Sequence, residues 1–188
     1  MEARALEVQV HEDEAPVFHD PAYTVYALDM PALQARIQRA GRAVGVGGDA
    51  FAATLLSAAP EFGGLVRLVG YEWLTPLRAG APAQLVTYWR ALDRGPSATR
   101  YGEPALRTFV HLLDENQSVA AGVDVLGAAA DTWQAGDTVV QLHNLALPSE
   151  PGLYAVEVGW YVPPEGPRLF LDGGHGDRVL LAPIEVQP

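Results

Sequence analysis

The sequence contains no cysteine, no lysine and only two asparagines. Without cysteine it can form no disulfide, no thiolate metal site and no thiol nucleophile. Without lysine it has no phosphate-loop lysine, and all twelve basic residues are arginines. No apolar run approaches the ~20 residues that a membrane-spanning helix needs, so we expect no direct membrane insertion. The start of the chain also lacks the charged-then-apolar pattern of a signal peptide.

Positive charge is scarce as well. The 188 residues include 23 acidic and 12 basic side chains, for a formal net charge of −11. Proteins bind nucleic acids through basic patches, so we expect no nucleic-acid partner. Hydrophobic residues make up 49% of the chain, which is enough for a core and excludes intrinsic disorder. The length suits one domain, or one domain with an extension.

Segments with β-strand character recur from residue 65 to the C-terminus. They alternate apolar and polar residues or are rich in β-branched and aromatic ones, and turn-forming residues separate them. The expected strands are Leu65–Leu74, Ala83–Leu92, Leu106–Leu113, Val119–Leu126, Thr138–Leu147, Leu153–Val162 and Arg178–Val186. Since no second long helical pattern occurs, the sequence predicts an all-β fold, an antiparallel two-sheet β-sandwich that is jelly-roll-like.

The first 61 residues predict an N-terminal extension to a sandwich domain over residues 62–188. Ala3–Val10 and Tyr23–Leu28 have strand character. Pro31–Ala40 predicts a short helix, with proline in its first turn and a glycine to end it. Gly41–Ala59 is rich in glycine and alanine, which predicts a linker or a loosely held segment.

Strong catalytic motifs are absent. The chain has neither the GxSxG nucleophile elbow nor the HExxH zinc motif. Gly45–Ala50 imitates a dinucleotide fingerprint, but it follows a helix rather than a strand. His111 stands alone in mid-strand, where a structural polar residue is the more common role. We therefore expect no catalytic residue and no cofactor.

The loop DGGHGD is the most polar segment of the chain. Asp172, His175 and Asp177 are weak candidate ligands for a divalent cation, because a glycine-rich loop can wrap oxygen ligands around an ion. The alternative is a solvated hairpin in which glycine supplies positive φ. Asp114–Gln117 has a similar turn explanation and lacks the spacing of a calcium loop.

Aromatic residues occur as adjacent pairs on the expected strands. Neighbours on a strand point to opposite faces, so Tyr88 and Tyr161 should point outward if Trp89 and Trp160 point into the core. Outward rings can stack on sugars, and the alternative is that they pack within the protein or at an interface. The candidate ligand-binding residues are Tyr161, Tyr88, Glu157 and Trp73. We expect Trp133 to plug the end of the sandwich.

Several stretches resemble, in their order along the chain, one known kind of module. They are LVGYEWL (68–74), LVTYWRAL (85–92), YGEPALRTFVHLLDENQSVAAGVD (101–124), DTWQAGDTVV (131–140), LPSEPGLYAVEVGWYVPPEGPRL (147–169) and DRVLLAPIEV (177–186). Over residues 62–187 the chain resembles the soluble C-terminal β-sandwich module of bacterial membrane glycosyltransferases. These enzymes use polyprenyl-phosphate sugars and form the protein mannosyltransferase and aminoarabinose transferase group.

The resemblance implies context more than chemistry. The family's catalytic acids lie in loops of the membrane region, so no catalytic residue is carried over to this sequence. The resemblance implies a non-catalytic accessory module on the extracytoplasmic side of the cell membrane, contacting glycan or acceptor, with a membrane glycosyltransferase domain as partner in cis. Two alternatives stay open: a structural or protein-interaction module without ligand and, less favoured, a glycoside hydrolase with a carboxylate pair.

Overall fold

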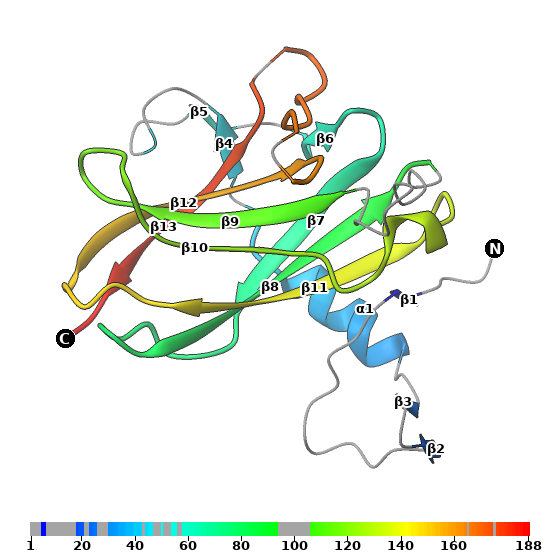
Figure 1. The fold of residues 1–188 in the computed structure, drawn as a ribbon, viewed down its shortest axis with the longest axis horizontal. Helices are drawn as coiled ribbons and strands as arrows, with labels where there is room; N and C mark the ends of the chain where they lie inside the picture. Colours follow the sequence, from blue (N-terminus) through cyan, green and yellow to red (C-terminus); the bar gives the residue numbers. More distant parts are fainter. Residues whose placement is uncertain are drawn as a thin grey trace.

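The computed structural model describes residues 5–6, 18–20, 23–25, 30–42, 44–46, 50, 54–55, 58–93, 106–164, 166–174 and 176–188. Within these ranges, two β-sheets pack face to face and one short helix lies against the outside of one of them (Figure 1). The predicted all-β, two-sheet antiparallel sandwich is confirmed.

The first sheet has five strands in the order β1-β11-β8-β7-β6. Their bounds are Ala5–Leu6 for β1, Thr138–Ala146 for β11, Pro82–Ala91 for β8, Val66–Trp73 for β7 and Glu61–Phe62 for β6. Neighbouring strands are antiparallel except β1 and β11, which are parallel.

The second sheet has six strands in the order β10-β9-β12-β13-β4-β5, and all its pairs are antiparallel. Their bounds are Val119–Val125 for β10, Arg107–Leu113 for β9, Gly152–Tyr161 for β12, Val179–Val186 for β13, Val44–Val46 for β4 and Thr54–Leu55 for β5. In a separate two-stranded sheet, β2 (Phe18–Asp20) pairs antiparallel with β3 (Tyr23–Val25), and a short 3-10 turn, η1 (Ala130–Thr132), lies between β10 and β11.

Each of the seven strands expected from residue 65 onward is present within two residues of its expected ends. The expected helix is also present, as α1 (Met30–Arg39). The described part of Gly41–Ala59 differs from a linker, because β4 pairs with β13 and β5 pairs with β4. Main-chain hydrogen bonds require no particular side chain, so a glycine-rich segment can still add strands to an open sheet edge. The boundary between residues 61 and 62 stays a prediction.

Tryptophan rings fill the centre of the core between the sheets. Trp89 and Trp133 both meet Trp160 edge-on, with ring centroids 5.0 and 5.6 Å apart. Edge-to-face contact is a favoured arrangement of aromatic rings. Trp133 is buried directly after η1 and belongs to the main core, and its predicted place at the end of the sandwich stays a prediction.

Helix α1 covers the outer face of the five-stranded sheet. Leu33 and Ile37 of the helix pack against a small cluster that includes Val86 and Tyr88 of β8. The helix approaches closely because the sheet has a glycine beneath its end: a Cβ added at Gly70 would lie 2.8 Å from the Ala40 Cβ. This face is therefore a second, smaller hydrophobic layer.

Candidate functional site

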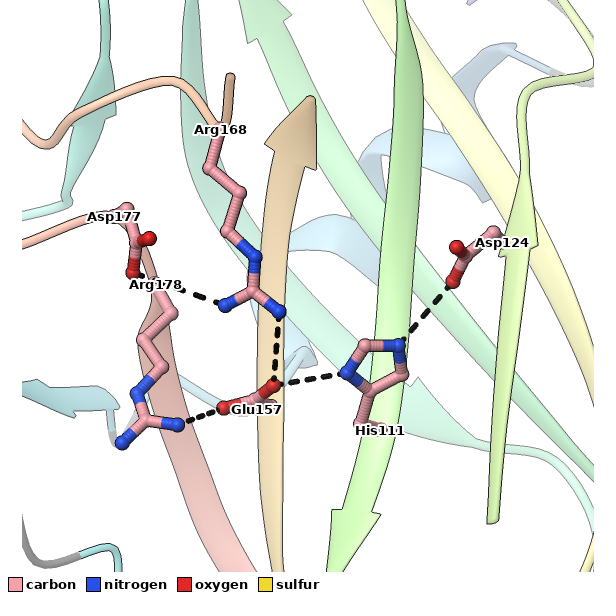
Figure 2. Close-up of polar contacts among 6 residues, drawn as sticks. All are labelled: His111, Asp124, Glu157, Arg168, Asp177 and Arg178. Atoms are coloured by element: carbon pink, nitrogen blue, oxygen red, sulfur yellow. Dashed lines mark hydrogen bonds and ion pairs between the residues drawn. The ribbon is translucent and has the colours of Figure 1, made fainter. Parts of the chain in front are cut away.

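A row of polar side chains crosses the outer face of the six-stranded sheet. Strand pairing places Glu157 of β12 opposite His111 of β9, and Asp124 lies on the neighbouring strand β10. The segment between β12 and β13 adds two arginines and another acid. We call these six residues the outer polar row, and Figure 2 shows them: His111, Asp124, Glu157, Arg168, Asp177 and Arg178.

Glu157 is the centre of the row, and only 2% of its surface is exposed. One carboxylate oxygen lies 2.9 Å from Nδ1 of His111 and 3.7 Å from a guanidinium nitrogen of Arg168, and the other accepts a hydrogen bond from Arg178. Burial by itself would raise the pKa of Glu157. The His111 hydrogen bond and the two arginines outweigh burial and hold this pKa below its usual value. Glu157 is therefore an ionised acceptor.

His111 bridges two carboxylates. Its Nδ1 faces Glu157, and its Nε2 lies 3.3 Å from Oδ1 of Asp124. Ionised carboxylates only accept hydrogen bonds, so a ring nitrogen that bonds to one of them does so as a donor. Both ring nitrogens of His111 therefore face carboxylates of the row.

An aromatic layer lies beneath the charges. The His111 ring stacks on Phe109 with centroids 4.9 Å apart, and the guanidinium carbon of Arg168 lies 4.2 Å from the centroid of the Phe109 ring. Two glycines make room for these rings. A Cβ at Gly159 would lie 2.4 Å from the Phe109 ring, and one at Gly122 would lie 2.6 Å from the His111 ring. The rings of Phe109 and His111 can lie against the backbone of the sheet because Gly159 and Gly122 carry no side chain.

Tyr161 extends the row toward the end of β12. Its hydroxyl lies near enough to the side chains of Asp124 and Arg107 for both to influence its pKa, and its ring is only half-buried. Burial raises the pKa of this phenol, and Asp124 raises it further. The prediction that Tyr161 and Trp160 point to opposite faces is confirmed, because Trp160 is buried in the main core. Tyr161 therefore lies on the same face of β12 as Glu157, near Asp124.

Tyr88 does not reach this site. It points away from Trp89 as expected, but the prediction of an exposed ring is wrong, since the side chain is 0% exposed. Helix α1 covers it, and its hydroxyl donates a hydrogen bond to Glu72. Burial and the neighbouring Glu72 raise the pKa of Tyr88. The outer face of β8 therefore offers no ring for a ligand to stack on at this position.

Trp73 also lies away from the row. It ends β7 in the other sheet, where it is half-buried against the main core, and its indole nitrogen is buried without a hydrogen-bond partner among the described residues. Its role in ligand binding stays a prediction.

The two candidate cation ligands of the glycine-rich loop that the structure describes, Asp172 and Asp177, have different surroundings. Asp172 is exposed, whereas Asp177 lies 3.8 Å from a guanidinium nitrogen of Arg168, and His175 lies outside the described residues. Gly173 and Gly174 have positive φ, as the hairpin interpretation expects. In the described part of the chain, no three His, Asp or Glu side chains are placed to hold a metal ion.

Sequence reasoning named Tyr161 and Glu157 but missed their partners. A signal was present, because His111 and Glu157 are polar residues in the middle of otherwise apolar strands. The missing information was the strand register. In the sequence, Glu157 is 46 residues from His111 and 21 residues from Arg178.

Compared with known proteins, the sequence matches no family model and no curated protein. None of the helical residues that the structure describes forms a segment long and apolar enough to cross a membrane.

Proposed function

We propose that this chain is a non-catalytic binding module that contacts a hydroxyl-rich ligand, a glycan or glycan acceptor, at the Tyr161 end of the outer polar row. The observation that carries the proposal is the half-exposed Tyr161 ring, whose hydroxyl lies near the side chains of Asp124 and Arg107. A sugar needs an aromatic face for its C–H groups and both donors and acceptors for its hydroxyls. These three side chains supply all of them within one small region of the surface.

Charge balance favours a neutral ligand. The row and its Tyr161 end contain as many arginines as carboxylates: three arginines (Arg107, Arg168 and Arg178) and three acids (Asp124, Glu157 and Asp177). An anion would be repelled by the acids as much as it is attracted by the arginines. Neutral hydroxyl groups meet no such penalty.

Hydrolysis by a carboxylate pair fits this geometry poorly. A glycosidase needs one carboxyl group with a raised pKa to donate a proton. Glu157 is buried among cations, and its pKa is lowered. The His111 ring lies between Glu157 and Asp124, where a substrate would have to bind. The proposal is therefore a binding module.

The sequence resemblance supplies the proposed context, an accessory module of a membrane glycosyltransferase on the extracytoplasmic side. Acceptor or glycan contact beside a sugar-transfer site would suit such a module. The partner would then be the membrane domain of the same enzyme.

A second candidate function is a protein-interaction module without a sugar ligand. The observation that favours it lies at the far end of the same face. Val119 and Leu153 are 57% and 58% exposed there, and buried Leu113 and Ala155 lie between them in the strand register. Exposed apolar side chains that lie close together on one face mark contact surfaces.

The test is a glycan array followed by titration of any hit with the folded chain. Tyr161→Ala should weaken binding by about 0.5–1.5 kcal/mol, the size of an aromatic contact. Phe170→Ala is the matched control, since Phe170 is a more exposed ring outside the row. Equal losses in the two variants would contradict the proposed site. If no glycan binds the intact chain at millimolar concentration, the interaction module becomes the better interpretation.

A further inference from the structure

The hairpin between β9 and β10 carries an acceptor motif for glycan attachment. Asn116, Gln117 and Ser118 form the pattern asparagine, any residue except proline, then serine or threonine. The chain has only one other asparagine, Asn144, which is followed by Leu145 and Ala146 and therefore lacks the hydroxyl residue.

The fold presents this motif at the surface. Oδ1 of Asp114 accepts hydrogen bonds from the backbone N–H groups of Asn116 and Ser118, each 2.9 Å long. Gln117 adopts the left-handed conformation with φ 61°, which completes the turn. Asn116 and Ser118 are both exposed, and their side chains form no hydrogen bond with any described residue. The backbone thus forms the turn without using the two side chains that a transferase must reach.

We propose that Asn116 is a site of asparagine-linked glycosylation. The co-substrate would be a polyprenyl-diphosphate-linked oligosaccharide, and the catalyst an oligosaccharyltransferase on the extracytoplasmic side. The Asn116 side-chain nitrogen attacks C1 of the first sugar, and the new N–C1 bond forms as the C1–O bond to diphosphate breaks. The lipid diphosphate leaves with that electron pair, and a base of the transferase takes the amide proton. Only the compartment is shared with the proposed function.

An attached glycan would also cover apolar surface next to the site. Val119 follows the motif directly and is 57% exposed, although its register partner Leu113 is buried. The C–H face of a sugar could cover such a side chain, whereas in the unmodified chain Val119 is exposed to water. The modification therefore accounts for an exposed apolar side chain at the hairpin.

The hairpin lies at the opposite end of β9 from the proposed ligand site. Arg107, the register partner of Tyr161, begins β9, and Leu113 ends it. Six residue steps of ~3.3 Å separate these ends by about 20 Å. A glycan on Asn116 should therefore leave binding at Tyr161 unchanged.

The test is to incubate the folded chain with an oligosaccharyltransferase and its polyprenyl-diphosphate oligosaccharide, and then to measure the intact mass. We expect one added glycan on the unaltered chain and on Asn144→Gln. We expect none on Asn116→Gln or on Ser118→Ala, which keeps the asparagine but removes the hydroxyl. Circular dichroism of each variant checks that it is folded.

A peptide of residues 112–120 shows whether the motif is accepted outside the fold. If the peptide gains the glycan and the folded chain does not, the hairpin blocks the site and the proposal is wrong. It is also wrong if neither is modified, or if the glycan is found on another residue. A chain that is modified at Asn116 but binds no free sugar supports this inference and contradicts the proposed sugar-binding function. The failure of one proposal can therefore be distinguished from the failure of the other.

Discussion

His143 should make the stability of this protein fall as the pH drops below about 6.5. The side chain is fully buried, its Nε2 lies 2.9 Å from the Thr87 hydroxyl oxygen, and its Nδ1 has no partner among the described residues. Burial lowers the pKa of His143 from 6.5 to about 3. At pH 5 the imidazole is therefore neutral in the folded chain and charged in the unfolded chain.

The size of the effect follows from proton linkage. Between pH 6.5 and 3 the unfolded chain binds one more proton at this residue than the folded chain, so stability decreases as the pH falls. The slope is about 1.4 kcal/mol per pH unit for one proton. This stability is fully present above pH 6.5, and about 2 kcal/mol of it is lost by pH 5.

Urea unfolding at pH 8, 7, 6 and 5 measures this loss. The comparison is His143→Gln, because glutamine does not titrate and can still form a hydrogen bond with Thr87. Between pH 8 and 5, the unaltered chain should lose about 2 kcal/mol more unfolding free energy than the variant does. The other histidines are common to both proteins and cancel in this difference. If both proteins lose the same amount, His143 takes up its proton in the folded state and the reasoning is refuted.

Two further predictions concern the core and the outer polar row. Trp160→Ala should destabilise the fold by about 3–5 kcal/mol in thermal or urea unfolding, because it empties the centre of the tryptophan core. Tyr161→Ala should destabilise it by about 1 kcal/mol or less, since the Tyr161 ring is half-exposed. The reverse order would show that the faces of β12 are assigned wrongly. Glu157→Gln should destabilise by about 2–3 kcal/mol at pH 7, because it leaves His111, Arg168 and Arg178 without their shared anion. The lowered pKa of Glu157 means that its contribution is present above the unfolded value near 4.5 and is lost as the pH falls through the lower folded value, so the stabilities of the two proteins should converge in acid. A constant difference down to pH 2 would contradict this assignment.

Local patterns in the sequence were enough to predict the strands and the orientation of Trp160 and Tyr161. Alternation along one strand determines which residues share a face, whatever that strand pairs with. The same rule gave the correct face for Tyr88 but not its burial. That burial depends on a helix about fifty residues earlier in the chain, whose docking position local alternation does not encode.

The outer polar row could be predicted only in part for a related reason. Glu157 and Tyr161 are recognisable as residues on the face away from the core. Their contacts with His111 and Asp124 depend on the register between β12, β9 and β10, and a shift of one residue would turn each side chain to the other face. The sequence alone does not specify that register, so the individual residues were predictable and their arrangement was not.

The pairing of β4 with β13 also bears on how the protein completes its fold during synthesis. Gly45 pairs with Leu180, so β4 has to wait until the much later β13 is made before it finds its partner. Such distant pairing is slow to form, because the entropy lost in closing the long loop comes before the stabilising contacts between the strands. Until β13 leaves the ribosome, β12 has β9 on one side and an open edge on the other. The six-stranded sheet is therefore most open to mispairing before β13 has been made, and a chain shortened to residues 62–188 would keep the edge of β13 uncovered after folding.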